Sequence, residues 1–403
     1  MDPYQESLRL HESRKGKIEV RSKIKISTMH DLSIAYTPGV AEPCRKIFGN
    51  RDDVYKYTSK WNLVAVVSDG SSVLGLGNLG AHAAIPVMEG KAILFKLLGG
   101  VDAFPVCIDS QDIEALIDTA ALVSPVFGGV NLEDIGAPRC FAVEKKLKER
   151  LDIPVFHDDQ HGLATVLYAG LSNALKVVGK KLRDVRIVIS GAGAAGTASA
   201  RMLHSAGVKN IVVADSKGII HKDRSDLRDN KIELAESTNP EGITGGLADA
   251  MEGADVFVGV SVGGIVTKDM VGKMADDAIV FALANPIPEI MPDEAEAGGA
   301  RVVATGRSDF PNQINNALGF PGIFRGALDT RARDINRAMK FAAARAISGL
   351  VDEPVEGCIV PNVLDRRVAL SVAKAVAEAS MKSGAARVNV SMDEVAARIP
   401  AYV

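Results

Sequence analysis

The run Val185-Arg-Ile-Val-Ile-Ser190 leads directly into Gly191-Ala192-Gly193-Ala194-Ala195-Gly196, and helix-forming residues continue from Thr197 to Leu203. A second apolar run, Asn210–Ala214, ends at Asp215, which lies 19 residues after the last glycine. A strand, a glycine-rich turn, a helix, a strand and an acid in this order are typical of a dinucleotide-binding unit. The glycines allow a tight turn and a close approach of backbone to a pyrophosphate, and the helix N-terminus offers free N–H groups to it. We therefore predict a nicotinamide dinucleotide site here, with FAD or an unliganded glycine turn as alternatives.

The choice between NAD and NADP depends on Asp215. A carboxylate at this place accepts hydrogen bonds from the ribose hydroxyls of NAD, whereas the 2′-phosphate of NADP would meet a like charge. The turn that follows, Ser216-Lys217-Gly218, has no arginine, although Lys217 and Lys222 could pair with a phosphate. We predict that NAD is preferred.

Apolar runs of strand length recur on both sides of this unit, and helical patterns alternate with them. Most runs are continuous rather than alternating, which is the pattern of parallel strands covered on both faces. The predicted strands are Leu63–Val67, Phe104–Ile108, Val126–Val130, Ile153–Phe156, Val185–Ile189, Asn210–Ala214, Val256–Val260, Ala278–Phe281 and Arg301–Ala304. The predicted fold is α/β, with an N-terminal α/β domain and a Rossmann-type doubly wound parallel sheet.

A chain of 403 residues suits two or three domains. A helical pattern over Leu163–Val178 ends at Gly179, just before the strand that opens the dinucleotide unit. We predict domains at 1–162 and 163–350, followed by a helical tail at 351–403 that packs on the core or on a partner subunit.

Composition excludes several classes of protein. Hydrophobic residues make up 47% and charged residues 24%, as in an ordinary globular chain, and the net charge of −3 gives no overall attraction for nucleic acid. No apolar stretch is long enough to span a membrane, and the charged segment Met1–Lys25 lacks the apolar core of a signal peptide. The four cysteines show no paired spacing, so we expect reduced thiols and a cytoplasmic location.

Carboxylates follow two of the predicted strands. Glu133 and Asp134 come after Val126–Val130, and Asp158 and Asp159 come after Ile153–Phe156. The carboxyl ends of parallel strands are where α/β folds bind ligands, and converging carboxylates suit Mg²⁺ or Mn²⁺. The residues alone leave a solvated loop charge equally open. Zinc is disfavoured because no cysteine lies near His157 and His161.

Two further residues are ambiguous on their own. Lys91 follows Glu89-Gly90 inside an apolar segment, where a lysine either keeps its ammonium in water or is buried with a lowered pKa. Tyr36 precedes Thr37-Pro38-Gly39 in a short turn, where most tyrosines only pack.

Taken together, the motifs resemble those of the malic enzymes, in their short prokaryotic form. The resemblance spans about Ile24 to Ser380. The stretches that carry it, in chain order, are Tyr36–Ala41, Val67–Gly70 with Leu74–Gly80, Gly90-Lys91, Asn131–Asp134, His157–Gly162, the glycine-rich turn, Ala284–Pro286 and Asn315–Gly322. The resemblance implies metal-dependent oxidative decarboxylation of (S)-malate to pyruvate and CO₂ with reduction of NAD or NADP, and a homodimer or a higher oligomer.

It also implies roles for individual residues. Tyr36 would be the general acid and Lys91 the general base, whose pKa would have to fall for it to act. Glu133, Asp134 and Asp159 would bind Mg²⁺ or Mn²⁺, with Asp158 in support of proton handling. Asn285, Asn315 and Asn316 would contact the substrate and the nicotinamide.

One departure and several alternatives remain. Long-form relatives carry an arginine that grips a malate carboxylate where this chain has Ser72, so another residue must supply that contact. The chain also ends at Val403 without the further acyltransferase-like domain of some relatives. Malolactic conversion of malate to lactate, a metal-dependent oxaloacetate decarboxylase and a non-catalytic nucleotide-binding regulator are the alternative functions.

Overall fold

Two β-sheets organise the chain in the computed structural model, which describes residues 3–400. The first sheet has the order β2-β1-β3-β4 and is parallel throughout. The second has the order β10-β9-β8-β5-β6-β7, parallel except for the short strand β7. The strands are β1 Leu63–Ser68, β2 Asp102–Cys107, β3 Gly129–Leu132, β4 Val155–His157, β5 Arg186–Ser190, β6 Asn210–Asp215, β7 Gly218–Ile219, β8 Val256–Gly259, β9 Ala278–Ala282 and β10 Ala300–Thr305.

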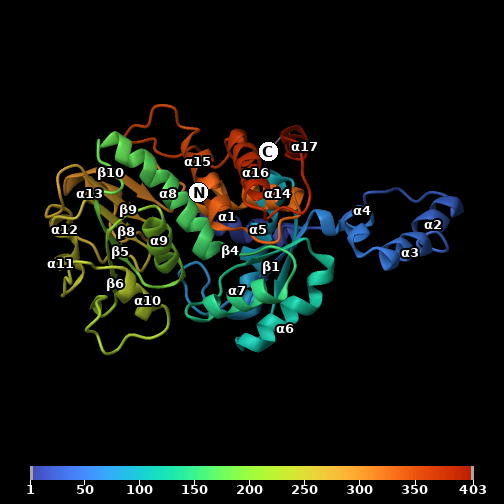
Figure 1. Ribbon diagram of the computed structural model, residues 1–403, viewed down its shortest axis with the longest axis horizontal. Helices are drawn as coiled ribbons and strands as arrows, with labels where there is room; N and C mark the ends of the chain where they lie inside the picture. The colour runs from blue at the N-terminus through green and yellow to red at the C-terminus, as the bar shows by residue number, and fades with distance from the viewer. Residues whose placement is uncertain (1–2, 401–403) are drawn as a thin grey trace.

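Helices cover both faces of the two sheets (Figure 1). Those up to the end of the first sheet are α1 Pro3–Arg14, α2 Met29–Ala35, α3 Ala41–Gly49, α4 Val54–Tyr57, α5 Gly80–Gly99, α6 Ile113–Val123, α7 Arg139–Arg150 and α8 Asp158–Val177. The later ones are α9 Ala194–Ser205, α10 Asn230–Ser237, α11 Leu247–Met251, α12 Lys268–Val271, α13 Pro292–Ala297, α14 Phe320–Asp329, α15 Arg337–Ser348, α16 Arg366–Lys382 and α17 Met392–Ala397. Short 3₁₀ turns lie at Arg51–Asp53, Ser59–Trp61, Ser124–Val126 and Asn316–Leu318.

Alternation of side chains along the buried strands places apolar residues on both faces of each sheet. In β1, Val64 and Val66 face a cluster with α5 and α14, whereas Ala65 and Val67 face α6 and α7. Because successive strand residues point to opposite faces, a strand covered on both sides must be apolar at every position. This explains the continuous apolar runs in the sequence.

The α/β fold class is confirmed, and a strand lies at each of the nine predicted places, with ends shifted by up to three residues. The largest shift is at β3, where Ser124–Val126 forms a 3₁₀ turn before the strand begins. The antiparallel strand β7 was not predicted, because two residues carry no usable periodicity.

Helix α8 begins five residues earlier than the predicted Leu163. Asp158 and Asp159 form its first turn, where negative charge is favoured by the helix dipole. The predicted boundary at 162/163 falls inside this helix, and the division of the chain into domains stays a prediction.

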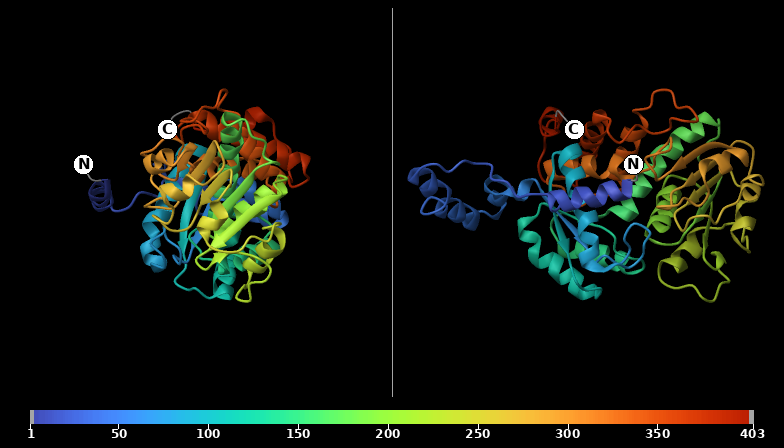
Figure 2. Two further views of the ribbon diagram at one scale, coloured as in Figure 1. Left: turned by 90° about the vertical axis from the view of Figure 1, so that its left-hand side faces the viewer. Right: turned by 180° about the vertical axis from the view of Figure 1, so that it is seen from behind.

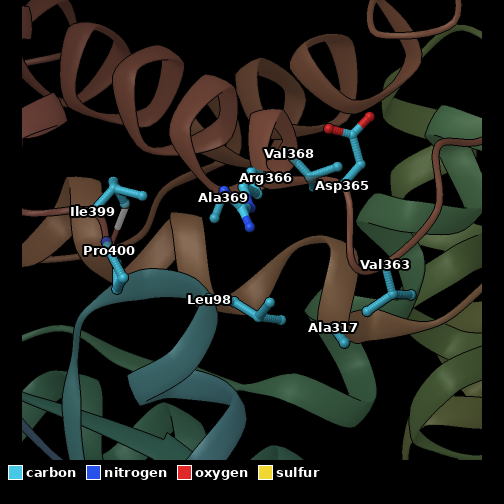
Figure 3. Close-up of a pocket in the computed structure, with 9 residues that line it drawn as sticks. All are labelled: Leu98, Ala317, Val363, Asp365, Arg366, Val368, Ala369, Ile399 and Pro400. Atoms are coloured by element: carbon cyan, nitrogen blue, oxygen red, sulfur yellow. The ribbon is translucent and has the colours of Figure 1, made fainter. Parts of the chain in front are cut away.

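The C-terminal helices return to the first sheet. Helix α16 packs against α14, α15 and α5, and Ile399 and Pro400 lie near Leu98 of α5 (Figure 3). The seam between these elements leaves a cavity of only about 10 Å³, so it is a packing contact. The tail therefore packs on the core of its own chain.

The segment with α2, α3 and α4 is set apart from both sheets. It projects from the body as an arm, visible at the right of Figure 1 and at the left of the rear view in Figure 2. Helices α2 and α3 bury none of their residues. Helices of seven and nine residues are marginal without a packing partner, so the arm is an element that lacks a core within its own chain.

Candidate active site

Three carboxylates converge where β3 and β4 end. Glu133 and Asp134 follow β3, and Asp159 lies in the first turn of α8 directly after β4. One oxygen from each lies within 4.8 Å of the others, and this is the one potential metal-binding group found among residues 3–400. Because β3 and β4 are parallel neighbours, their carboxyl ends meet at one sheet edge. The structure thus brings together the three predicted metal ligands.

The electrostatics of this group favour a bound cation. Burial raises the pKa of Asp134 to about 8, and the nearby Asp159 carboxylate adds to the effect. Burial also raises the pKa of Glu133 well above its ordinary value. Asp134 Oδ2 is buried without a hydrogen-bond partner, so a lone pair is left to bind a positive charge. Oxygen ligands of this kind fit Mg²⁺ or Mn²⁺.

Lys91 projects from α5 into the same group and is 7% exposed. Its Nζ lies 2.8 Å from Glu133 Oε1 and 2.5 Å from Asp158 Oδ2. Burial lowers the pKa of Lys91, but the Asp158 and Glu133 carboxylates outweigh burial and hold the pKa above its ordinary value. Two anions are the nearest charges to Lys91 in this arrangement, and the fall in its pKa beside a bound cation stays a prediction.

Asp158 is fully buried and links the lysine to a predicted substrate residue. Its Oδ2 accepts hydrogen bonds from Lys91 Nζ and from Asn316 Nδ2, each at 2.5 Å. A Cβ on Gly162 would lie 1.8 Å from Asp158 Oδ1, so only glycine leaves room for this carboxylate. Burial raises the pKa of Asp158, against the opposing effect of Lys91.

The glycine-rich turn lies as predicted between β5 and α9. Gly191 has φ +116°, and a Cβ on Gly196 would lie 1.8 Å from the Gly191 carbonyl oxygen. Gly193, Ala194 and Ala195 line one cleft together with Lys91 and the three carboxylates. This cleft has a volume of about 1050 Å³ and also includes Asn285, Asn315 and Asn316. It is large enough for a dinucleotide and a small substrate to share.

Asp215 ends β6, but its surroundings differ from those expected. Arg224 contacts it at 2.9 and 3.2 Å, and Lys231 at 2.6 Å. These hydrogen bonds lower the pKa of Asp215 despite its burial. The turn at residues 216–218 contains no arginine, but the chain brings Arg224 back to Asp215 from beyond that turn. Lys217 instead pairs with Asp226 at 2.9 Å.

Tyr36 is the predicted residue that the structure does not bring to the cleft. It follows α2 on the projecting arm and is 67% exposed. It is absent from the described residues that line the cleft. Within a single chain, the expected general acid and general base are therefore apart.

Two buried residues have a role at the site that was not predicted from the sequence. Asn131 Nδ2 donates to Glu133 Oε2 at 2.8 Å and so orients a carboxylate of the group. Glu289 is fully buried and accepts the backbone N–H groups of Ser261 and Ala284, joining the loops that follow β8 and β9. A lone acid after Pro288 gives no signal of such a role in the sequence. Ser72, which stands in place of the expected arginine, does line the cleft.

Known proteins resemble this chain along most of its length. The sequence profile of "Malic enzyme, N-terminal domain" matches residues 15–148, and that of "Malic enzyme, NAD binding domain" matches residues 161–381. The chain is 55% identical to the bifunctional malic/malolactic enzyme of Bacillus subtilis, over 97% of this chain and 96% of the relative. It is 57% identical to the NAD-dependent malic enzyme of Geobacillus stearothermophilus, over 92% and 78% of the two chains.

Solved structures show the same likeness. The crystal structure of the malic enzyme from Pyrococcus horikoshii superposes with a TM-score of 0.93 at 51% identity, covering 97% of this chain and 94% of that one. A NAD-dependent malic enzyme from Thermotoga maritima gives a TM-score of 0.89 at 47% identity, over 92% of this chain and 98% of that one.

Proposed function

The chain belongs to the malic enzyme family, oxidoreductases that decarboxylate malate with NAD or NADP, and from this premise we propose which of its residues carry out the reaction. The observation that carries the proposal is one cleft that holds the glycine-rich turn, Lys91 and three converging carboxylates. Oxidation needs the dinucleotide beside the substrate, and decarboxylation needs positive charge at the ketone that oxidation produces. The cleft offers a place for each.

Glu133, Asp134 and Asp159 would hold Mg²⁺ or Mn²⁺. When bound, such a cation lowers the pKa of a substrate hydroxyl and draws electrons from a carbonyl. The buried Asp134 Oδ2 without a partner and the raised pKa values of Asp134 and Glu133 support this assignment.

Lys91 is the proposed base, which removes the hydroxyl proton of malate as hydride leaves C2 for the nicotinamide. Its close contact with Asp158 supplies a route to the neutral amine, because a proton can be shared within this buried pair. Asp158 would position Lys91 and take up its proton. Asn285, Asn315 and Asn316, which line the same cleft, would orient the substrate and the nicotinamide.

Loss of CO₂ from the resulting keto acid leaves an enolate that needs a proton at C3. Tyr36 is the proposed donor, yet it lies on the exposed arm of its own chain. We therefore propose a homodimer in which the arm of each copy covers the other and brings Tyr36 to the partner's cleft. The arm's exposed apolar side chains support this: Met29 (76%), Ile34 (62%) and Phe48 (96%) need a covering surface.

NAD is the proposed preferred cofactor, because the Asp215 carboxylate can accept hydrogen bonds from ribose hydroxyls. Arg224 and Lys231 already bind Asp215 and would attract a 2′-phosphate as well, so we expect the preference to be modest. No helix among residues 3–400 has the length and apolar character needed to cross a membrane. A cytoplasmic location stays a prediction, supported by the absence of disulfides among these residues.

The direct test follows absorbance at 340 nm with malate and either nicotinamide, with and without Mn²⁺. Reduction of the dinucleotide that needs both malate and metal, with pyruvate as the product, is the expected result. Metal-independent reduction, or no reduction at all, would contradict the proposal.

A second candidate, malolactic conversion, is favoured by one observation: the B. subtilis relative is named a bifunctional malic/malolactic enzyme. The two reactions share their residues up to pyruvate. Lactate formed from malate without net accumulation of NADH would show malolactic activity, and pyruvate in proportion to NADH would exclude it.

A further inference from the structure

Under the proposed function, the cleft must bind malate, which is an anion, although the cleft is itself lined with acids. Malate carries two carboxylates, and the cleft is already lined by Glu133, Asp134 and Asp159, with the buried Asp158 in contact with Lys91. Lys91 is engaged by two of these acids, and a divalent cation would offset only part of the remainder. Ser72, where an arginine was expected, carries no charge. A dicarboxylate therefore needs a further cation in this cleft.

The described residues lining the cleft include no arginine, and their other basic residues are His11 and Lys17. Lys17 follows the N-terminal helix α1 and lies against α5, the helix that carries Lys91. Its backbone N–H donates to Glu89 Oε2 at 2.8 Å, and its Nζ donates to the Pro86 carbonyl oxygen at 2.7 Å. A Cβ on Gly90 would lie 3.3 Å from Lys17 Nζ, so the ammonium sits beside the residue that precedes Lys91.

The local backbone holds Lys17 in this position. Gly16 has φ +105°, and a Cβ there would come within 3.0 Å of Glu89 Oε1, so glycine lets the chain pass close to this carboxylate. Glu89 thus anchors the segment through the backbone N–H of Lys17 and leaves the ammonium directed at Pro86.

The ammonium of Lys17 retains capacity for a ligand. An ammonium has three donors, and a single carbonyl accepts one of them. Among the described residues, no carboxylate oxygen lies within salt-bridge distance of Lys17 Nζ. Burial lowers the pKa of Lys17, partly offset by Glu89, as expected of an ammonium partly removed from water without an ion-pair partner.

We propose that Lys17 binds the carboxylate of malate that lies away from the hydroxyl, and so selects a dicarboxylate over a monocarboxylic 2-hydroxy acid. Lys17 is then a substrate-binding residue. It supplies the positive charge that an arginine provides in the long-form relatives. The competing interpretation is that Lys17 only ties the N-terminal segment to α5.

The test compares malate with 2-hydroxybutyrate, which has a methyl group in place of the distal carboxylate. The KM for malate and the inhibition constant of 2-hydroxybutyrate are measured at saturating NAD and Mn²⁺ for the wild type, Lys17→Met and Lys17→Arg. Lys15→Met is the matched control, since Lys15 is exposed, lies two residues away and is not among the cleft residues.

Lys17→Met should raise the KM for malate by about 10- to 100-fold, the scale of a hydrogen-bonded charge, and leave the inhibition constant of 2-hydroxybutyrate unchanged. Lys17→Arg should restore most of the affinity, and Lys15→Met should behave as the wild type. The KM for NAD and the melting temperature distinguish this effect from misfolding.

Failure of the proposed function and failure of the role of Lys17 give different results. A wild-type protein that does not oxidise malate refutes the proposed function. A wild type that oxidises malate, with a folded Lys17→Met variant of unchanged KM or with both constants raised together, overturns the role of Lys17 alone.

Discussion

The charge of single side chains decides most of the chemistry in the cleft. Four acids and one lysine are packed at the end of β3 and the start of α8, and water reaches few of them. In such surroundings each ionised group depends on the charges next to it, so pKa values move apart. Lys91 is held charged by Asp158 and Glu133, whereas burial and a like charge push Asp134 towards its neutral form.

Asp134 should make the metal-free protein less stable as the pH rises. Its pKa is about 8 when folded and near 4 when unfolded, so between these values the folded chain binds the extra proton, and stability falls with rising pH. Asp134→Asn removes this dependence. The free energy of unfolding of the wild type relative to the variant should therefore fall from pH 4 to pH 8, by up to about 1.4 kcal/mol per pH unit.

Urea denaturation of both proteins in the presence of a chelator measures this difference. With saturating Mn²⁺, the difference in unfolding free energy should change little with pH, because the bound cation favours the ionised carboxylate at every pH in the range. A difference that does not vary with pH in the chelated protein would show that Asp134 titrates normally.

Asp215 should set the choice of dinucleotide. In Asp215→Ser the like charge that opposes a 2′-phosphate is gone, and Arg224 and Lys231 lose the carboxylate that they bind. The ratio of kcat/KM with NADP to that with NAD should rise by about 10-fold or more, the scale of a charge-assisted contact. Adding Arg224→Ala to this variant should reverse most of the gain, and an unchanged ratio in Asp215→Ser would show that other residues set the preference.

At the scale of elements, the first turn of helix α8 positions two acids of the site. The helix begins directly after β4, so its first turn places Asp158 towards Lys91 and Asp159 towards Asp134. The next two residues, Gln160 and His161, both bond to Glu144 of α7, which anchors this first turn of α8. The two acids therefore point to different partners although they are neighbours in sequence.

Gly162→Ala tests whether the position of the Asp158 carboxylate depends on the absence of a side chain at Gly162. Alanine normally stabilises a helix by about 1 kcal/mol relative to glycine. Here the new methyl group would lie 1.8 Å from Asp158 Oδ1, so the carboxylate must move away from Lys91. We expect kcat for malate oxidation to fall by at least about 10-fold, since misplaced catalytic groups lose that much or more.

Gly357→Ala is the control, because Gly357 lies in the loop after α15, away from the cleft and the arm, and a Cβ there meets nothing within 4 Å. Its kcat should match the wild type. The affinity for NADH, measured by fluorescence, should be retained in both variants. Full activity in a folded Gly162→Ala protein would mean that the position of Asp158 is not critical.

At the scale of the whole molecule, the arm is the feature that a single chain does not explain. The arm projects away from both sheets (Figures 1 and 2). Tyr36, which directly follows α2, and several apolar side chains of the arm are exposed. Packing the arm on a second copy would cover this surface and complete both clefts, as symmetric dimers allow.

Mixed dimers test this arrangement. Tyr36→Phe and Lys91→Met should each be inactive as homodimers, with losses of about 10²–10⁴-fold. When the two are co-expressed, a heterodimer has one cleft with an intact lysine and a tyrosine from the other copy. Random pairing should restore about a quarter of the wild-type activity per dimer. If each tyrosine serves its own chain, the mixture stays inactive, because every cleft then lacks one of the two residues.

Much of this protein follows from local sequence. The strands of both sheets could be predicted because a doubly covered strand must be apolar at each position, and the dinucleotide turn because only glycine fits at Gly191 and Gly196. Glu133, Asp134 and Asp159 could be anticipated as neighbours because parallel strands end at a common edge. These features depend on periodicity and on steric limits, which act over a few residues.

Tertiary structure decided what depends on contacts between distant segments. Arg224 reaches Asp215 through a loop that no pattern marks, and Glu289 joins two strand ends from a third segment. The pKa of Lys91 is held above its ordinary value because two carboxylates from different elements surround it. Tyr36 is exposed because none of residues 3–400 buries the arm helices α2 and α3. Electrostatic energy and burial depend on distances in space, and a linear sequence does not contain them until the chain is folded.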